Sequence, residues 1–366
     1  MSTTLSNRVQ KVKPSATMAV SDKAKELKSQ GIQIISMGSG EPDFDTPTNI
    51  QKAAIHAIGA GETRYTPADG TAELKKAVCE KFKRENGLDY STNEVMVSCG
   101  GKQVFYNLCQ AILNEGDEVI IPSPYWVSYP DMAILADAIP VFIDAGLDQD
   151  FKISPEQLEA SITSKSKLLV LNSPSNPTGS VYSRSEIEAL GVVLERYPNV
   201  FIISDDIYEH IRWGDDEFVN IAMACPKLKD RTVILNGVSK AYAMTGWRIG
   251  YAAGPGSVIK AMKKIQGQST SNPSSISQAA ALEAIAGDQS FIKMMVEAFE
   301  RRHEFLVESL NAIDGIECPR SGGAFYSFPR VQGLINRIGL KDDVEFSAYC
   351  LEKLNLAVVP GSAFGA

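Results

Sequence analysis

One lysine of the chain has the surroundings of a catalytic nucleophile. Lys240 lies between Ser239 and Ala241, shortly after the apolar run 233–235. An amine beside a desolvated strand end has a lowered pKa, and its neutral form can attack a carbonyl group. Taken singly, Lys240 is explained more simply as a solvated surface residue, and Arg248 as a structural ion-pair partner. The chemistry therefore depends on which residues the other predicted strands carry at their ends.

Polar residues suited to an aromatic cofactor follow two further apolar runs. Asp205 follows the run 201–203 and could keep a pyridinium nitrogen protonated, or it could cap a helix. Tyr208 and Asn176 could hydrogen-bond a phenolic ring oxygen. The structural alternatives are core packing for Tyr208 and a tight Asn-Pro-Thr-Gly turn for Asn176. Each residue has its own structural explanation, but the set is what an electron-sink cofactor needs.

A phosphate cradle completes the requirements of pyridoxal phosphate (PLP) chemistry, which also uses a lysine imine and an acid at the ring nitrogen. Gly100, Gly101 and Lys102 precede the predicted helix 104–113 and offer free backbone amides to a dianionic phosphate. Trp126 could cover the face of the ring, although a core position is the default for tryptophan. Together these residues favour PLP chemistry.

The candidate residues fall at the ends of short β-branched runs that alternate with amphipathic segments. We predict strands at 94–97, 118–121, 168–171, 201–204, 233–235 and 249–252, and helices at 72–84, 104–113 and 187–194. Strands separated by helices predict an α/β fold with a mostly parallel sheet covered by helices on both faces. Ligands of such sheets bind beyond the carboxyl ends of the strands, where the candidate residues lie.

The pattern changes after about residue 290. We predict a long charged helix at 291–310, short strands around 324–328, a helix near 344–354 and an apolar run at 356–359. A chain of 366 residues also exceeds the roughly 250–300 at which one hydrophobic core stops growing. The sequence therefore predicts a large domain at 48–290 and a smaller α+β domain formed by 1–47 and 291–366.

Composition and missing motifs exclude several classes of protein. The net charge of −8 and the pI near 5.2 do not attract nucleic acid. The sequence has no run of about 18 apolar residues, so we predict no membrane span, and we expect no apolar leader. The six cysteines form no C-x-x-C pair and the three histidines are dispersed, so we expect a reduced, cytoplasmic, metal-free protein. The glycine motifs of dinucleotide and P-loop sites and the serine-hydrolase elbow are also missing from the sequence.

Several motifs carry a resemblance to a known family. They are Lys-Pro-Ser-Ala-Thr at 13–17, Gly-Glu-Pro-Asp-Phe at 40–44, Arg-Tyr at 64–65, Gly-Gly-Lys-Gln at 100–103, Ser-Pro-Tyr-Trp-Val-Ser-Tyr-Pro at 123–130, the segment 172–179 and the lysine segment 237–250. Because it has these motifs in this order and spacing, the chain resembles the class I and II aminotransferases of PLP fold type I, close to the bacterial aspartate/prephenate aminotransferase subgroup. The resemblance extends from about residue 5 to the last residue.

The resemblance implies three catalytic residues, Lys240, Asp205 and Tyr208. Lys240 would form an imine with PLP and then carry the proton between the substrate Cα and the cofactor. Asp205 would pair with the pyridine nitrogen, and Tyr208 and Asn176 would hydrogen-bond the ring oxygen. Trp126 would stack on the ring.

The resemblance also implies the ligands of the phosphate and of the substrate. The phosphate set is Gly101, Lys102, Ser239, Arg248 and Tyr65, of which Tyr65 would reach the phosphate of the neighbouring subunit. The substrate set is Gly40, Trp126, Asn176, Lys102, Ser15 and Thr17. Gly40 and Asn176 match positions that contact the substrate carboxylate. Lys102, Ser15 and Thr17 match the group that receives the side-chain carboxylate of an acidic substrate.

Three features depart from the family pattern. Asp206 replaces a more usual glutamate, and Gly237 lacks a hydroxyl that other branches aim at the phosphate, so Arg248 and backbone amides should carry more of the phosphate binding. The segment 360–366 matches the one that precedes the arginine for the substrate carboxylate, and no arginine follows Arg337. We therefore expect the C-terminal part of the small domain to be missing, with PLP binding retained and transamination slowed.

The predicted function is PLP-dependent transfer of an amino group from an acidic L-amino acid, aspartate first, to 2-oxoglutarate by a cytoplasmic homodimer. Thr17 and Lys102 permit two substrate carboxylates, so a prephenate or aromatic aminotransferase is an alternative. A PLP-dependent β-eliminating lyase is a second, and it would release a 2-oxo acid without an amino acceptor. A non-catalytic PLP-binding regulator would need a DNA-binding extension, which this acidic chain does not show.

Overall fold

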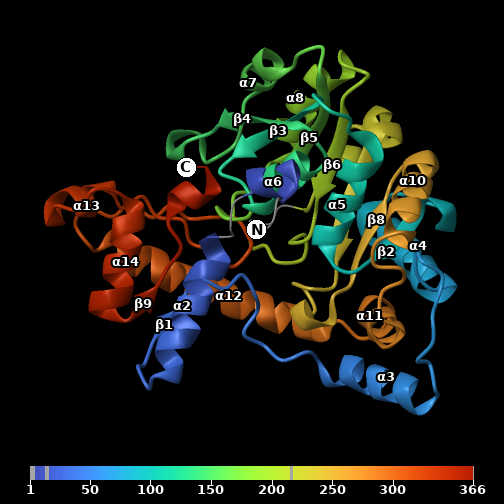
Figure 1. The fold of residues 1–366 in the computed structure, drawn as a ribbon, viewed down its shortest axis with the longest axis horizontal. Coiled ribbons are helices and arrows are strands. Elements are labelled where there is room, and N and C mark those ends of the chain that lie inside the picture. Colours follow the sequence, from blue (N-terminus) through green and yellow to red (C-terminus); the bar gives the residue numbers. More distant parts are fainter. Residues whose placement is uncertain (1–4, 13–15, 215–216, 366) are drawn as a thin grey trace.

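A seven-stranded β-sheet forms the centre of the computed structural model, which describes residues 5–12, 16–214 and 217–365 (Figure 1). The strands, in sheet order, are β2 (Val95–Ser98), β8 (Gly250–Ala253), β7 (Thr232–Gly237), β6 (Phe201–Asp205), β5 (Ser166–Asn172), β3 (Glu118–Ser123) and β4 (Ile139–Asp144). Neighbouring strands are parallel, except that β8 runs antiparallel to both β2 and β7. The predicted α/β fold with a mostly parallel sheet is confirmed.

Helices cover both faces of the sheet. One face packs against α5 (Gly101–Ile112), α6 (Ser128–Leu135) and α10 (Gly256–Gly267). The other face packs against α7 (Pro155–Ser161), α8 (Arg184–Glu195) and α9 (Ile221–Ala224) at one side, and α3 (Thr48–Gly59), α4 (Ala72–Asn86) and α11 (Ser275–Ala286) at the other. Successive strand residues alternate between the two layers, as Ile202 and Ile203 do. Burial on both faces explains the continuous apolar runs that predicted these strands.

Local sequence signals set the ends of the helices. At the start of α8, the Ser183 hydroxyl accepts a hydrogen bond from the Glu186 amide while the Glu186 carboxylate accepts one from the Ser183 amide. α4 begins after Thr71, whose hydroxyl accepts from the Leu74 amide, and it ends at Gly87 with φ of +65°. The predicted helices are found, with boundaries shifted by a few residues. Within the described ranges, no helix is both long and apolar enough to cross a bilayer.

Two parts of the predicted pattern of elements are wrong. β4 is missing from the predicted strands because Pro140, its second residue, leaves only the short apolar run 141–143, and because this edge strand exposes Phe142. The short strands expected around 324–328 do not form, since none of these described residues belongs to a strand. An isolated bridge between Arg212 and Gly323 is the nearest β pairing. Ala324, Phe325 and Tyr326 pack instead in a cluster with Tyr208 and Ile211, which follow β6.

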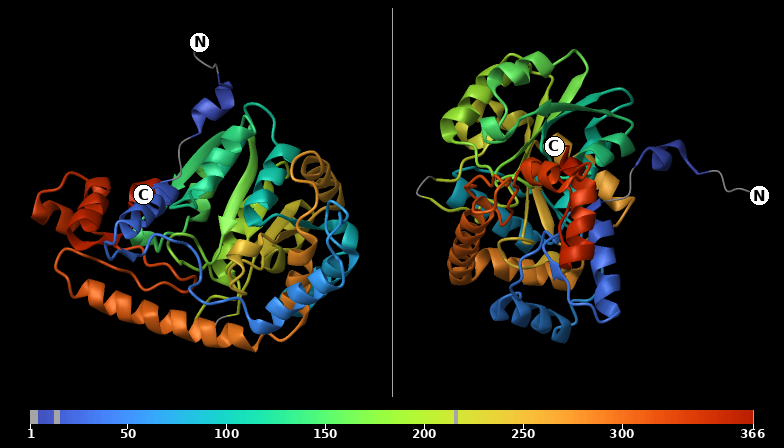
Figure 2. Two further views of the ribbon diagram at one scale, coloured as in Figure 1. Left: turned by 60° about the horizontal axis from the view of Figure 1, so that its bottom comes forward. Right: turned by 90° about the vertical axis from the view of Figure 1, so that its left-hand side faces the viewer.

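The two ends of the chain meet in a separate two-stranded parallel sheet. β1 (Ile35–Ser36) pairs with β9 (Leu356–Ala357), so that Ile35 lies opposite Leu356. α2 (Ala16–Ser29) and α14 (Asp343–Leu354) pack beside this sheet around a small apolar core. Figure 1 shows this group and α13 (Gln332–Ile338) at one side of the large sheet, with the long α12 (Ser290–Asn311) running between the two parts. Figure 2 shows α1 (Asn7–Lys11) at the outside of the molecule, where Arg8 pairs with Asp137 just after α6 at 3.8 Å.

Candidate functional site

Most of the predicted site residues gather beyond the carboxyl ends of the parallel strands. Gly101 follows β2, Asn176 follows β5, Asp205 is the last residue of β6, and Lys240 follows β7. These strands lie close together in the sheet, separated only by β8 between β2 and β7. Because parallel strands end at the same edge, the fold brings residues from distant parts of the sequence into one region.

Asp205 is buried at the end of β6, with 4% of its surface exposed. Its Oδ2 accepts a hydrogen bond from the Tyr129 hydroxyl at 2.5 Å, and its Oδ1 accepts one from the Ile207 amide at 3.2 Å. Burial raises the pKa of Asp205 to about 6, against the opposing effects of these hydrogen bonds and of Lys240. The carboxyl group is therefore mostly ionised at neutral pH.

Lys240 lies among aromatic rings above the sheet edge. Its Nζ is 5.8 Å from the centre of the Tyr208 ring and 5.7 Å from that of the Phe325 ring. It donates a hydrogen bond to the carbonyl of Gly40. Burial lowers the pKa of Lys240 to about 8, and Arg248 acts in the same direction. The amine therefore has a substantial neutral fraction close to physiological pH.

Two tyrosine hydroxyls meet beside Lys240. Tyr208 is buried on the turn after β6, and its hydroxyl is hydrogen-bonded to that of Tyr326. A Cβ at position 40 would lie 2.9 Å from the Tyr326 hydroxyl oxygen, so Gly40 fits this close approach. Burial holds the pKa of Tyr208 well above its usual range, which keeps the hydroxyl protonated. Tyr326 is not among the sequence-predicted site residues, and its local sequence gives no signal for this contact.

Backbone amides and a guanidinium form a corner where β2 leads into α5. Gly100 caps α5 with φ of +92°, a conformation that favours glycine, and the first amides of the helix have no partner within it. A Cβ on Gly100 would collide with the Arg248 guanidinium, and one on Gly250 with the amide of Gly101. The Arg248 Nη2 donates to the Cys99 carbonyl at 3.3 Å. The glycines thus allow the guanidinium to lie against a helix start, which is an anion-binding arrangement.

Lys102 and Trp126 lie side by side near this corner. The Lys102 Nζ is 5.2 Å from the centre of the Trp126 ring. Burial lowers the pKa of Lys102, and the charge of Arg248 lowers it further. The Trp126 ring contacts the Tyr129 ring edge-to-face, with centroids 5.2 Å apart. Two cations and an aromatic face are therefore close to the start of α5.

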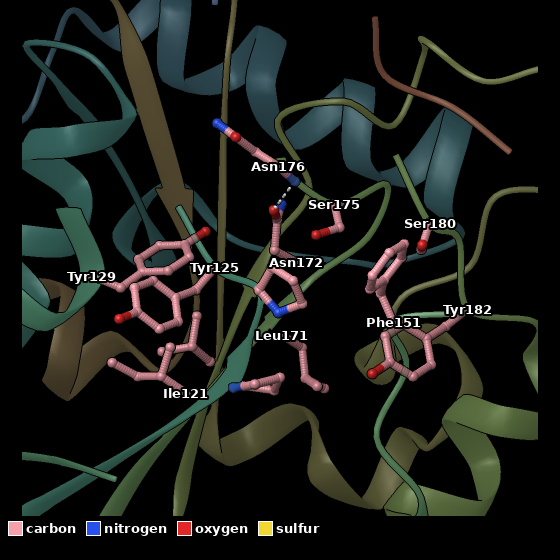
Figure 3. A pocket seen from close by; sticks show the side chains of 13 residues that line it. Ile121, Tyr125, Tyr129, Phe151, Leu171, Asn172, Ser175, Asn176, Ser180 and Tyr182 are labelled. Carbon is pink, nitrogen blue, oxygen red and sulfur yellow. Dashed lines mark hydrogen bonds between the residues drawn. The ribbon is translucent and has the colours of Figure 1, made fainter. Parts of the chain in front are cut away.

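Asn176 is linked to Asp205 through Asn172. The Asn172 Oδ1 accepts from the backbone amide of Asn176 at 2.7 Å, and its Nδ2 donates to the Asp205 carbonyl at 2.9 Å. Figure 3 shows the hydrogen bond between Asn172 and Asn176 at a pocket that Tyr125 and Tyr129 also line. The ends of β5 and β6 are thereby held together at the site.

The remaining predicted site residues are Ser239, which lies beside the group, Tyr65, which the structure does not bring into it, and Thr17 and Ser15. Ser239 is buried next to Lys240, with 6% of its surface exposed. Tyr65 lies between α3 and α4 with 91% of its surface exposed, so this chain alone does not bring it into the group. Thr17 lies in α2, and Ser15 lies outside the described residues.

A buried polar cluster lies behind the turn that carries Tyr208. Lys81 of α4 is fully buried, forms an ion pair with Glu209, and donates to the Asn86 side chain at 2.9 Å. The Asn236 side chain of β7 donates to Glu209 at 2.7 Å. The cluster therefore ties α4, the turn after β6 and the end of β7 to one another.

Three members of this region, Glu85, Glu209 and His210, are spaced as metal ligands could be. The Lys81 ammonium lies 3.5 Å from Glu85 and is paired with Glu209, so it already supplies positive charge to both carboxylates. Burial works against the ionised form of Glu85, yet the His210 hydrogen bond and the Lys81 charge lower its pKa to about 2. We assign the cluster a structural role.

The strand ends bring a partly neutral lysine, a buried acid and an anion-binding corner to one edge of the sheet. The family model and the named relatives show that the chain is an enzyme of the transferase type. The chain belongs to the family of class I and II aminotransferases, whose family model it matches over residues 32–366. The family expected from the sequence motifs is confirmed.

Named relatives and solved structures resemble this chain over nearly its whole length. The chain is 57% identical over 367 residues to an aspartate/prephenate aminotransferase of Nitrosomonas europaea, covering 99% of this chain and 92% of that protein. It is 46% identical to the solved aspartate aminotransferase of Rhizobium meliloti, with a TM-score of 0.94 and coverage of 100% and 92%. For the Thermus thermophilus aspartate aminotransferase solved with maleate, the identity is 43%, the TM-score 0.93 and the coverage 100% and 93%. These likenesses confirm the predicted fold type.

Proposed function

We propose that this protein catalyses PLP-dependent transamination between an acidic amino acid, aspartate first, and 2-oxoglutarate. The observation that carries the proposal is the convergence of three residues at one sheet edge, where Lys240 is partly neutral, Asp205 is mostly ionised and Arg248 lies against the start of α5. The names of the relatives support aspartate as the donor. The same names favour prephenate transamination as a second activity.

The residues of the site fit PLP in charge and in shape. A buried carboxylate suits a protonated pyridine nitrogen, and the start of α5 with Arg248 suits a dianionic phosphate. A side chain at Gly100 would fill the phosphate corner. When bound there, PLP supplies an electron sink for the electrons released at the substrate Cα.

We assign the following roles to the residues around PLP. Lys240 binds the cofactor covalently and moves the proton at the substrate Cα, which its partly neutral amine supports. Asp205 keeps the ring nitrogen protonated, Tyr208 and Asn176 hydrogen-bond the ring oxygen, and Trp126 stacks on the ring. The proposed phosphate ligands are Gly101, Lys102, Ser239, Arg248 and, from a second subunit, Tyr65.

The proposed substrate contacts lie on two sides of Lys240. Gly40, whose carbonyl accepts from the Lys240 amine, and Asn176 contact the carboxylate next to Cα. Lys102, with Thr17 and Ser15, receives the distal carboxylate. The position of the Lys102 cation beside Trp126 supports this assignment, because Trp126 is itself a proposed substrate contact.

We further propose a homodimer, on the evidence of exposed apolar side chains. Tyr65 is 91% exposed, and Ile55 and Ile58 of α3 are 66% and 55% exposed. The pairing of β1 with β9 supports a division into a large domain at 48–290 and a small one made of 1–47 and 291–366. The cysteines are unpaired, which supports a reducing compartment such as the cytoplasm.

The proposal is tested with the purified protein, PLP and a panel of amino donors and 2-oxo acids. We expect the highest kcat/KM with aspartate and 2-oxoglutarate, and borohydride reduction should label Lys240, with Lys240→Ala folded but unlabelled. Labelling of a different lysine, or no turnover with any donor, would contradict the proposal. Release of a 2-oxo acid without an amino acceptor would instead support a β-eliminating lyase.

A further inference from the structure

Tyr129 is buried next to Asp205. It belongs to the motif at 123–130, but the sequence alone assigns it no role. It lies on α6, with 2% of its surface exposed. Its ring packs against Phe105 of α5, with centroids 4.9 Å apart, and against Trp126, with centroids 5.2 Å apart. This packing fixes the ring so that the hydroxyl meets the Asp205 carboxylate.

The contact has the geometry of a hydrogen bond to a charged acceptor. The hydroxyl oxygen lies 2.5 Å from the Asp205 Oδ2, within the range for a hydroxyl that donates to a carboxylate. Burial holds the pKa of Tyr129 well above its usual range, so the hydroxyl keeps its proton and acts as the donor. The Ile207 amide holds the other carboxylate oxygen at 3.2 Å, and Asn172 holds the Asp205 carbonyl.

The titratable groups that face Asp205 come from four segments. They are Tyr129 from α6, Tyr208 from the turn after β6, Lys240 from the segment after β7, and Tyr326 from the segment 324–328. The three tyrosines are neutral at physiological pH, and Lys240 carries the opposite charge. Burial disfavours the ionised form of Asp205, and the hydrogen bond from Tyr129 favours it. Removing the Tyr129 hydroxyl therefore destabilises the ionised carboxylate.

We propose that Tyr129 is a positioning residue, which by donating to the Asp205 Oδ2 keeps this carboxylate ionised and in one orientation for the ring nitrogen of the cofactor. The inference rests on the proposed function, because that function gives Asp205 its partner. Tyr129→Phe keeps the ring between Phe105 and Trp126 and removes only the donor. A hydrogen bond to a charged group corresponds to about 10- to 100-fold in binding, so a loss of this size in PLP affinity is expected.

The test compares PLP binding by three proteins from about pH 5.5 to pH 8.5, a range that spans the titration of Asp205. They are the wild type, Tyr129→Phe and the matched control Tyr182→Phe. Tyr182 is also buried, and its hydroxyl is hydrogen-bonded to the Ile153 amide at 2.9 Å rather than to Asp205. Equilibrium dialysis gives the dissociation constant at each pH, and circular dichroism shows that each variant is folded.

We expect Tyr129→Phe to weaken PLP binding near neutral pH. The pH below which PLP affinity falls should be higher than in the wild type by about one unit. Tyr182→Phe should change neither quantity. A Tyr129→Phe profile that overlays the wild type, or an equal loss in Tyr182→Phe, would overturn the inference and leave the proposed function intact. A wild-type chain that does not bind PLP would overturn the proposed function and the inference with it.

Discussion

Burial moves the pKa values of Asp205 and Lys240 toward each other. The pKa of Asp205 rises to about 6 and that of Lys240 falls to about 8, in each case mainly because burial disfavours the charged form. An acid and an amine with such values can both change protonation state near neutral pH. At the scale of single residues, the site is therefore suited to proton transfer.

The rate at which the PLP-free protein incorporates PLP is expected to rise with pH and to level off above about pH 8. The neutral amine is the nucleophile, and its fraction rises about tenfold per pH unit below the pKa of Lys240. Stopped-flow absorbance measures this rate, with Lys240→Ala as the control that shows no covalent incorporation. A rate that still rose steeply beyond about pH 9 would indicate the pKa of an ordinary lysine.

Lys102→Met is expected to raise the KM for aspartate about tenfold or more, while the KM for an aromatic donor changes little. The methionine retains the apolar stem beside Trp126 but lacks the charge that would meet a distal carboxylate. Steady-state kinetics with each donor measure the effect, and Lys260→Met, at an exposed position of α10, is the control. An equal loss with both donors and weaker PLP binding would assign Lys102 to the phosphate alone.

At the scale of elements, the turn after β6 depends on a buried ion pair. Glu209 follows Tyr208 directly and is held by Lys81 of α4 and by Asn236 of β7. β7 leads into the segment that carries Lys240. The cluster thus fixes two strand ends of the site from behind.

Lys81→Met is expected to lower the free energy of unfolding by about 3–5 kcal/mol, because it leaves the Glu209 carboxylate buried without its cation. Urea unfolding followed by circular dichroism measures this loss. Lys76→Met is the matched control, since Lys76 lies on the exposed side of the same helix. A loss no larger than that of the control would mean that Glu209 does not need the ion pair.

Strands that are buried on both faces could be predicted from the sequence, whereas the edge strand β4 and the conformation of the segment 324–328 could not. The strands at 168–171 and 201–204 are continuous apolar runs and were found as β5 and β6. The edge strand β4 has exposed side chains and a proline as its second residue, so only the short run 141–143 marks it in the sequence. The segment 324–328 is apolar because it packs toward the site, a reason for apolar residues that strand prediction does not distinguish.

The site residues also divide into those that the local sequence predicts and those that it does not. Lys240, Asp205 and Asn176 stand after apolar runs, and the strand-end rule places such residues together. Tyr129 acts on a residue 76 positions away, and Tyr326 meets a residue 118 positions away. Contacts over such separations leave no local pattern, so only the folded chain identifies them.

At the scale of the whole molecule, the exposed face of α3 should be the dimer interface. Ile55→Asp with Ile58→Asp is expected to shift the protein toward monomers and to weaken PLP binding, because the partner's Tyr65 would be lost from the phosphate. Sedimentation velocity measures the first effect and equilibrium dialysis the second. Val192→Asp on α8, where Val192 is 65% exposed, is the control. An unchanged dimer in the double variant would place the interface elsewhere.

The pairing of β1 with β9 has a consequence for how the chain is made. Ile35 pairs with Leu356, so the 320 residues between the two partners must be synthesised before they can meet. At about 5–20 residues per second, the ribosome needs on the order of 15–65 seconds for this stretch. During that time Ile34 and the apolar side of α2 lack Ala357 of β9, which completes their shared core. The nascent N-terminal segment is therefore where a chaperone should bind, and it should be released as β9 emerges.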